Sequence, residues 1–494
     1  MEIGTGVSLA LYFIVMIAIG LYGFKESTSD TSGYLLGGRR LGPAVTSLSA
    51  GASDMSGWML LGLPGAMYVS GLSAAWIAFG LLLGALANYL LVAPKLRVYT
   101  EVANDAITIP DYFEKRFEDR SRLLRVISSI VIVIFFTLYT SSGVVAGGKL
   151  FESAFGLSYY WGLYVTAGVV VLYTLLGGFM AVSMTDFVQG CIMFVALILV
   201  PVVAFTGVGG GSEFVATIEG IDPALLDLFS GMTLVGIISA MSWGLGYFGQ
   251  PHIIVRFMAI RSVKDVATAR NIGMSWMFVT LVGALATGLV GLAYVTQRGI
   301  PLDDPETIFI VLSSDLLFNP FIGGFLLAAI LAAIMSTISS QLLVSSSSLT
   351  EDFYKIFLRR KAKQKELVLV GRISVVAVAA VAILLAYDRS SSVLGLVSNA
   401  WAGFGAAFGP VVLLSLFWKK MTRWGALAGM IAGAVTVLLW VYVFQLSSVM
   451  YEIVPGFLVC LVTIIVGSLL TPGPKASVED TFDEMKSEMT DRLG

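Results

Sequence analysis

The stretch Ser47-Leu-Ser-Ala-Gly-Ala-Ser-Asp-Met-Ser-Gly-Trp58 places one carboxylate, Asp54, inside an apolar segment that continues to Tyr68. A charge at bilayer depth costs about 2.5–3.5 kcal/mol on insertion scales, so it needs a partner, a cavity or a function. Glycines and serines around Asp54 weaken the helix locally. Unwound carbonyl groups at membrane depth can line a cavity and coordinate a cation. This segment therefore predicts a site for an ion and a substrate.

The composition of the whole chain is that of a membrane protein. Of its 494 residues, 57% are apolar and 13% are charged, whereas soluble proteins carry about 25% charged residues. Apolar runs long enough to cross a bilayer recur from end to end. We expect an all-α polytopic protein with one integral domain over residues 1–472 and a cytoplasmic tail over 473–494.

The apolar runs predict thirteen transmembrane helices, centred near residues 14, 56, 83, 137, 168, 194, 244, 284, 333, 377, 405, 434 and 460. With the N-terminus outside and the C-terminus inside, the inside connections are 25–42, 95–125, 177–186, 256–270, 350–372, 419–424 and the tail. These connections hold 27 of the 30 Lys and Arg residues. The positive-inside rule therefore favours this orientation.

A second interrupted segment, Met241-Ser-Trp-Gly-Leu-Gly-Tyr-Phe-Gly-Gln-Pro-His252, lies five spans after the first. Its three glycines and one proline should kink or unwind a helix. Two interrupted spans in corresponding positions indicate an inverted-repeat transporter with its site at the midplane. We expect one repeat over about 43–207 and the other over about 231–418.

Ala333, Ser336 and Thr337 share one face of the ninth predicted span because they are three and four residues apart. Their carbonyl and hydroxyl oxygens could hold a hard cation such as sodium. The alternative is that both hydroxyls bond their own helix or a neighbouring helix. The spacing leaves both readings open.

Trp243, Tyr247 and Pro251 recur at every fourth residue of the second interrupted segment. Such an aromatic wall can hold a cationic amine and an apolar ring, or it can be a packing stripe. Asp186 stands at the start of the sixth span, where most such residues are N-caps. His252, the only histidine, is expected to be a packed or interfacial residue, with a proton relay as the alternative.

Gly143-Val-Val-Ala-Gly-Gly-Lys149 has the spacing of a phosphate-binding loop, but Leu150 follows where Ser or Thr is required. We therefore expect no nucleotide partner. No nucleophile–base pair or metal cluster is evident, and no nucleic-acid partner is expected. The sequence does not predict an enzyme.

Several long motifs resemble the sodium:solute symporter family, and within it the sodium/proline symporters. They include Leu36-Gly-Gly-Arg39, Leu48-Ser-Ala-Gly-Ala-Ser-Asp-Met-Ser-Gly57, Gly62-Leu-Pro-Gly-Ala66, Gly244-Leu-Gly-Tyr-Phe-Gly-Gln-Pro-His252 and Ala400-Trp-Ala-Gly-Phe-Gly-Ala-Ala-Phe-Gly-Pro410. The resemblance implies a LeuT-like fold of two inverted five-helix repeats, with one extra helix before them and two after.

The resemblance also implies roles for individual residues. It implies a sodium site made by Ala52, Met55, Ala333, Ser336 and Thr337. It implies substrate contacts from Ser56, Gly57, Tyr139, Trp243, Tyr247 and Pro251. It implies coupling roles for Asp54 and Arg39, and a possible second sodium site at Asp186, Ser339 and Ser340.

The function expected from this resemblance is sodium-coupled uptake of L-proline across the cytoplasmic membrane by alternating access. The partners are then proline, sodium and the lipid bilayer. A symporter for another small amino acid or carboxylate is the main alternative, because a sodium site does not name the solute. A channel or a membrane sensor is a more remote alternative.

Overall fold

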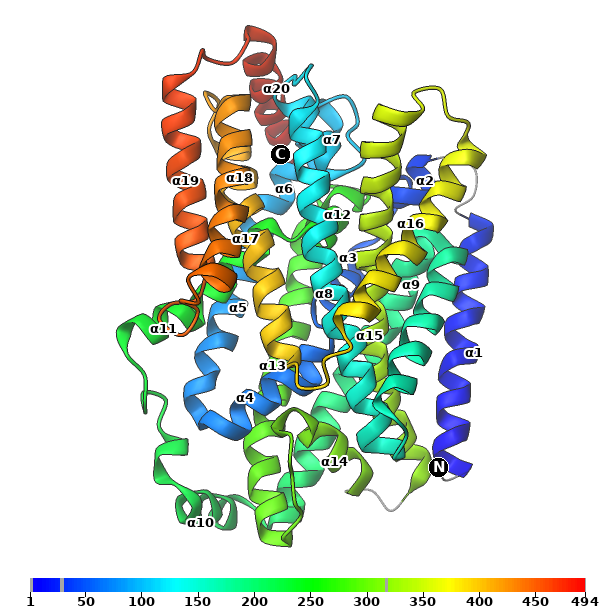
Figure 1. Ribbon diagram of the computed structural model, residues 1–494, viewed down its shortest axis with the longest axis vertical. Helices are drawn as coiled ribbons and strands as arrows, with labels where there is room; N and C mark the ends of the chain where they lie inside the picture. The colour runs from blue at the N-terminus through cyan, green and yellow to red at the C-terminus, as the bar shows by residue number, and fades with distance from the viewer. Residues whose placement is uncertain (1–2, 27–30, 316–318, 494) are drawn as a thin grey trace.

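The computed structural model describes residues 3–26, 31–315 and 319–493, and within them the fold is helical, without strands (Figure 1). The α-helices are α1 Ile3–Glu26, α2 Thr31–Leu36, α3 Pro43–Asp54, α4 Leu63–Ser70, α5 Ala75–Ala87, α6 Ala93–Val102, α7 Ile109–Arg116, α8 Leu123–Phe155, α9 Tyr159–Val208, α10 Gly211–Ile221, α11 Leu234–Met241, α12 Pro251–Ala259, α13 Asp265–Arg298, α14 Ile308–Asp315, α15 Pro320–Ser347, α16 Gln364–Leu385, α17 Val393–Phe417, α18 Arg423–Leu438, α19 Ile453–Leu470 and α20 Ala476–Leu493. The 3₁₀ and π segments used below are η1 Gly37–Arg39, η2 Trp58–Gly62, η6 Ser242–Gly249, η7 Pro305–Thr307 and η8 Ser348–Leu358.

Ten helical segments of the described chain are long and apolar enough to cross a membrane. The segment Trp58–Val102 covers parts of two predicted spans, and two shorter apolar helices, Tyr159–Leu172 and Leu234–Gly249, match two more. The all-α, multi-pass prediction is therefore confirmed. The exact number of thirteen crossings stays a prediction.

The first interrupted segment breaks immediately after Asp54. Helix α3 starts at Pro43, whose fixed φ suits a first helical position, and ends at Asp54. Met55, with φ −79° and ψ 75°, leaves the helical region. The chain resumes as the π segment η2 and then α4, so the backbone at Met55 and Ser56 is unwound within the protein.

The second interrupted segment breaks at Gln250, whose φ of −80° and ψ of 107° are extended. The 3₁₀ segment η6 precedes it, and α12 begins at Pro251, which lacks an amide hydrogen. Glycines let this segment lie against α5: a Cβ on Gly84 would clash with the carbonyl oxygen of Gly244. Both predicted interruptions are therefore real breaks in the backbone.

The connection predicted over residues 177–186 is shorter than expected, because the only non-helical residue within α9 is Gly178 and helix resumes directly after it. The helix bends at Gly178, which has φ 60° and ψ −170°, a conformation that favours glycine. The two predicted spans on either side are thus joined by a kink rather than a loop. Asp186 lies eight residues inside the second half and is not an N-cap.

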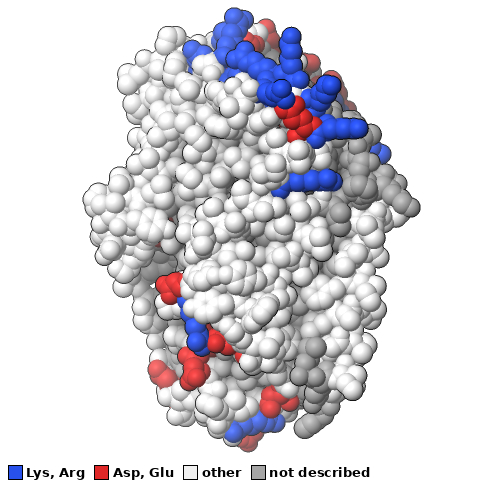
Figure 2. Space-filling model, turned by 45° about the vertical axis from the view of Figure 1, so that its right-hand side comes forward, with Lys and Arg blue, Asp and Glu red and all other residues white. Residues whose placement is uncertain are grey.

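The two termini lie at opposite ends of the molecule, with the C-terminus at the upper end of Figure 1. Lys and Arg side chains gather at that same upper end in Figure 2. This asymmetry agrees with the predicted inside location of the C-terminus, although the orientation in a membrane stays a prediction.

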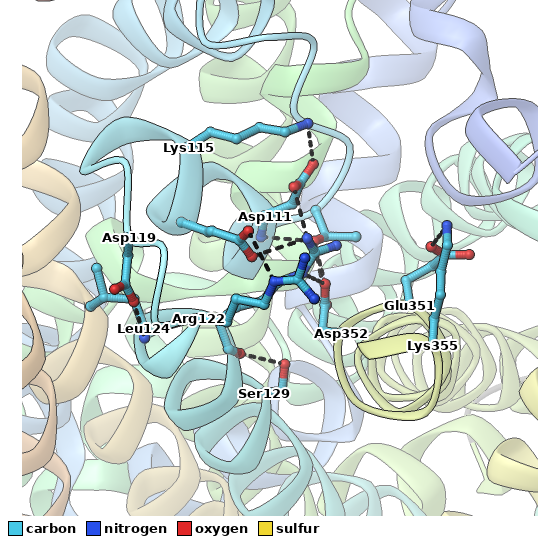
Figure 3. A network of polar contacts seen from close by, with 12 residues as sticks. Asp111, Lys115, Asp119, Arg122, Leu124, Ser129, Glu351, Asp352 and Lys355 are labelled. Carbon is cyan, nitrogen blue, oxygen red and sulfur yellow. Dashed lines mark hydrogen bonds and ion pairs between the residues drawn. The ribbon is translucent and has the colours of Figure 1, made fainter. Parts of the chain in front are cut away.

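An ion network joins α7, α8 and η8 at the upper end (Figure 3). Arg125 Nε lies 2.6 Å from Asp352 Oδ1, and its Nη1 lies 3.2 Å from Asp111 Oδ1 and 3.1 Å from Glu114 Oε2. Asp352 is fully buried. One guanidinium therefore holds three carboxylates from two separate segments together.

The tail forms α20, which packs against α6 through a buried apolar face. Phe482 is fully buried, and the guanidinium of Arg116 lies 5.3 Å from its ring. Lys475 pairs with Glu118 at 3.0 Å, and Arg492 pairs with Glu101. The tail is thus a helix docked on α6.

Glu306 of η7 joins α8 to the start of α17. Its Oε2 accepts a 2.7 Å bond from Lys149 on α8 and a 2.9 Å bond from the backbone N–H of Val393. Its Oε1 accepts from Ser392 Oγ and from the N–H of Leu394. One carboxylate therefore pairs with a lysine and caps the start of α17 at once.

Candidate functional site

The two backbone breaks meet at Asp54 and Tyr247. The Tyr247 hydroxyl donates a 2.5 Å hydrogen bond to Asp54 Oδ2, and both residues are buried. The bond is charge-assisted when the carboxylate is ionised, which makes it stronger than a neutral hydrogen bond. Two segments 193 residues apart are thereby joined through the carboxylate that the sequence singled out.

The backbone carbonyl of Asp54 accepts from the Ser56 N–H at 2.9 Å and from two side chains. Trp58 Nε1 donates at 3.0 Å, and the hydroxyl of Tyr139 on α8 donates at 3.2 Å. An unwound segment leaves carbonyl groups without helical partners, and these side chains supply partners here. Tyr139, predicted as a substrate contact, thus lies directly at the first break.

A cavity of about 30 Å³ adjoins this pair, lined among others by Asp54, Met55, Asn88, Tyr89 and Tyr247. Within the described residues, Asp54 Oδ1 is buried without a hydrogen-bond partner. The space suffices for water, which needs about 10–15 Å³ by this measure, but not for an amino acid. A substrate at this point requires the surrounding side chains to move.

The predicted sodium ligands come together between α3 and α15. Ser336 Oγ lies 2.7 Å from the Ala52 carbonyl oxygen and 3.1 Å from that of Ala333. Thr337 Oγ1 lies 3.4 Å from the same Ala52 oxygen. The Ser336 hydroxyl therefore bonds both its own helix and α3, and the Thr337 hydroxyl bonds α3, so neither of the two readings of the sequence excludes the other.

This set consists of neutral oxygens, which hard cations prefer as ligands. Met55 contributes the backbone of the break, while its sulfur accepts a 3.7 Å contact from Thr280. Among the described residues, no group of three or more His, Cys, Asp or Glu could hold a metal. The donor set fits sodium better than a transition metal.

The aromatic wall predicted from the second segment includes partners from other helices. Trp243 stacks on Tyr451 with a centroid distance of 5.2 Å, and Trp401 Nε1 donates a 2.7 Å bond to the Trp243 carbonyl. Tyr247 meets Trp401 edge-on at 5.1 Å. Pro251 begins α12 on the far side of the break.

Ser56 and Gly57 occupy the turn between α3 and η2. Ser56 Oγ accepts a 3.4 Å bond from the Trp58 N–H. A Cβ on Gly57 would lie 2.8 Å from the Cβ of Ala146, so only glycine lets α8 approach this closely. These two predicted substrate residues therefore adjoin the Asp54 site.

Arg39 belongs to η1 and contacts α6 and α12 rather than Asp54. Its Nη1 donates to the Met258 carbonyl at 2.7 Å and to Thr100 Oγ1 at 3.0 Å, and its Nε lies 2.9 Å from Asp105 Oδ1. Burial lowers the pKa of Arg39, an effect that nearby Asp105 partly offsets. Arg39 thus ties η1 to the end of α12 and to α6.

Of the residues of the possible second sodium site, Asp186 and Ser340 lie together and Ser339 bonds its own helix. Ser339 Oγ donates at 3.1 Å to the Ser336 carbonyl of its own helix. Asp186 does lie 3.4 Å from Ser340 Oγ, but its Oδ2 is also 3.0 Å from Arg256 Nη2. A guanidinium therefore stands where the predicted ion would bind.

Reasoning from the sequence missed two residues of this centre. Arg256 was assigned to the inside connection 256–270, yet it is 1% exposed within α12. The apolar run Ile253-Ile-Val-Arg-Phe-Met-Ala259 on both sides of it was the available signal. Trp401 belongs to the motif that runs from Ala400 to Pro410, but nothing in the sequence indicated that it contacts Trp243.

His252 is fully buried, and its ring lies edge-on to Phe136 at 5.3 Å and to Tyr139 at 5.9 Å. This confirms the expected packed histidine.

Comparisons with known proteins agree with this architecture. A model of the sodium:solute symporter family matches residues 34–433. The osmoregulated proline transporter OpuE of Bacillus subtilis is 59% identical over 487 residues, which cover 98% of this chain and 99% of OpuE. The high-affinity proline transporter PutP of the same organism is 60% identical over 475 residues, which cover 96% of this chain and all of PutP.

Among solved structures, a sodium-coupled sialic acid symporter in a substrate-bound outward-open state superposes with a TM-score of 0.79 at 20% identity. The match covers 96% of this chain and 99% of that one. At this identity the likeness shows the fold, which is the predicted LeuT-like arrangement.

Proposed function

The chain belongs to the sodium:solute symporter family, and we propose on this basis that it imports L-proline together with sodium. It is a multi-pass protein of the cytoplasmic membrane and a transporter rather than an enzyme. Sodium is the coupling ion of the family and is carried as a co-substrate. Residues 43–207 and 231–418 are the two repeats in this proposal.

The observation that carries the proposal is the convergence of both breaks on Asp54. Ser336 on α15 reaches the Ala52 carbonyl at 2.7 Å, and Tyr247 in the second break reaches the Asp54 carboxylate at 2.5 Å. Ala52, a proposed ion ligand, is two residues before Asp54, whose side chain contacts Tyr247 of the aromatic wall. This short path supports coupling between ion and solute.

In this mechanism sodium binds the carbonyls of Ala52 and Met55 and the oxygens of Ala333, Ser336 and Thr337. The ion orders the unwound backbone beside it. The first amides of η2, after Ser56 and Gly57, then offer N–H groups to the proline carboxylate, because a helix start carries positive partial charge.

The pyrrolidinium ring packs on the faces of Trp243 and Tyr247, with Tyr139 and Pro251 on either side. The Tyr247 hydroxyl links this ring site to Asp54. Sodium must raise the affinity for proline by the same factor by which proline raises that for sodium. A potential of 100 mV, inside negative, adds about 2.3 kcal/mol per imported charge.

The test is uptake of radiolabelled proline into proteoliposomes with and without an inward sodium gradient. We expect saturable accumulation that requires sodium and that excess unlabelled proline abolishes. Competition by other small amino acids and carboxylates examines the alternative solutes. Uptake that is unaffected by removing sodium would contradict symport, and preferential competition by another solute would contradict proline.

A further inference from the structure

Asn88 is a buried polar residue at the point where α5 changes into a π-helical turn. The turn, η4, covers Asn88–Val92, and π turns within α-helices are frequent at functional sites. Within the described residues, the buried Oδ1 of Asn88 has no hydrogen-bond partner. Buried polar atoms are usually bonded to protein or to ordered water. The position and the free oxygen of Asn88 both call for a partner nearby.

The side of α5 that carries Asn88 lies against the second backbone break. Gly80, Gly84 and Asn88 are four residues apart and therefore share one side of the helix. A Cβ on Gly80 would lie 2.2 Å from the Met241 carbonyl oxygen, and one on Gly84 would lie 2.2 Å from that of Gly244. Asn88 therefore lies one turn further along the interface between α5 and η6, where η4 also contacts η6.

Asn88 and Asp54 line the same cavity of about 30 Å³. Asp54 Oδ2 accepts the hydrogen bond from Tyr247, whereas Asp54 Oδ1 is buried without a partner among the described residues. The cavity therefore adjoins two residues that each have an unpartnered oxygen. It has room for a water molecule, and a buried water needs polar partners of this kind. Because water donates two hydrogen bonds, one molecule can serve both oxygens.

We propose that Asn88 is a positioning residue for Asp54 and that the two side chains share a water in this cavity. The proposal rests on the proposed symport function, in which Asp54 has a coupling role. Tyr247 bonds one oxygen of the carboxylate and the water bonds the other. A carboxylate held at both oxygens keeps one orientation beside the unwound backbone at Met55, which preorganises it. The water also links α5 to the two breaks.

The first test looks for the water. A structure of the full-length protein without solute, at a resolution that shows waters, should place one within hydrogen-bond distance of Asp54 Oδ1 and the Asn88 side chain. In Asn88→Leu, which keeps a similar volume and removes the amide, this water should be lost. A dry cavity, a sodium ion at that place, or a water that remains in Asn88→Leu would overturn the proposal.

The second test measures uptake. In Asn88→Leu the sodium concentration for half-maximal proline uptake should rise by about three- to tenfold, the effect of one lost hydrogen bond, and the maximal rate should change less. Asn88→Ser keeps a hydroxyl that can bond water and should recover most of this loss. Asn271→Leu makes the same change at an exposed asparagine of α13 and should behave like the parent protein.

A double-mutant cycle separates positioning of Asp54 from a general structural role. If Asn88 acts through Asp54, Asn88→Leu should change the binding of radioactive sodium little in the Asp54→Asn background. Effects of the two substitutions that multiply would overturn the proposal, as would an Asn88→Ser variant no better than Asn88→Leu.

The search for the water and the sodium-binding measurements need no proline. If both give the expected results but the protein does not take up proline, the proposed solute fails while the role of Asn88 stands. If proline uptake requires sodium but Asn88→Leu behaves like the parent protein, the symport function stands and the role of Asn88 fails.

Discussion

The Tyr247 hydroxyl is bonded at 2.5 Å to the Asp54 carboxylate, so the broken helices of the two repeats share one hydrogen bond at the centre of the protein. The donor lies on the residue expected to contact the solute, and the acceptor lies beside the expected ion site. Because this bond joins the two breaks, a movement of one break displaces the other or breaks the bond.

Tyr247→Phe tests this bond while keeping the aromatic ring. Loss of a hydrogen bond to a charged group costs about 1.5–3 kcal/mol, so the sodium concentration for half-maximal uptake should rise by about 10- to 100-fold. Tyr89→Phe is the matched control, because Tyr89 lines the same cavity without bonding Asp54. Equal effects of both variants would rule out a specific role for the bond.

Asp54→Asn removes the charge and keeps an oxygen that can accept from Tyr247. Sodium-driven uptake should fall by about the 5- to 150-fold that coupling between two ligands contributes, while the protein still inserts and extracts normally. Proteoliposome uptake at varied sodium measures the change. A sodium affinity within about twofold of that of the parent protein would contradict this role of the carboxylate.

Ser336→Ala removes the hydroxyl that reaches the Ala52 carbonyl at 2.7 Å. We expect sodium affinity to fall by about tenfold, the worth of one lost ligand contact, with little change in maximal rate. Ser339→Ala is the control, since its hydroxyl turns back to the Ser336 carbonyl. If Ser339→Ala weakens sodium binding equally, the ion site is placed wrongly.

Trp243→Ala removes the ring that stacks on Tyr451. Proline binding should weaken by about 5- to 30-fold, in line with cation–π and stacking energies, and sodium binding in the absence of proline should change less. Trp161→Ala, at a residue 65% exposed, is the control. Isothermal titration or a scintillation proximity assay measures both ligands, and an unchanged proline Kd contradicts the aromatic wall.

Phe482→Ala opens the buried face of α20. Truncation of a buried Phe costs about 3–5 kcal/mol, which should detach the tail and expose the segment before Ala476 to protease. Limited proteolysis should cut this variant faster than the parent, whereas Leu493→Ala, at a 51% exposed position, should not differ. Equal cleavage rates for Phe482→Ala and the parent would show that α20 does not depend on this ring.

The sequence predicted the two breaks well because glycine, serine and proline act on the backbone locally. Asp54, Tyr247 and the Ala333–Thr337 face were likewise visible as single patterns on single segments. Contacts between distant segments could not be predicted. The spacing of residues did not pair Asp186 with Arg256 or Trp243 with Trp401. A charged residue near the end of a span is usually predicted to lie in a loop. Arg256 was therefore placed in the inside connection 256–270.

Helix α9 shows the same limit. Two apolar runs predicted two spans joined by an inside connection over residues 177–186. In the structure two helices meet at Gly178, whose positive φ of 60° favours glycine. The sequence therefore predicted where the two spans separate, but not that they meet in a kink at one glycine.

Glu306 makes the first turn of α17 dependent on a residue outside that helix. The carboxylate satisfies two amides of α17 and one ammonium of α8 at the same time. If these helices separate, the same step removes the cap from the start of α17 and one of the two carboxylate partners of Lys149, which are Glu306 and Asp304. Water entering the gap would then have to replace four hydrogen bonds to one carboxylate.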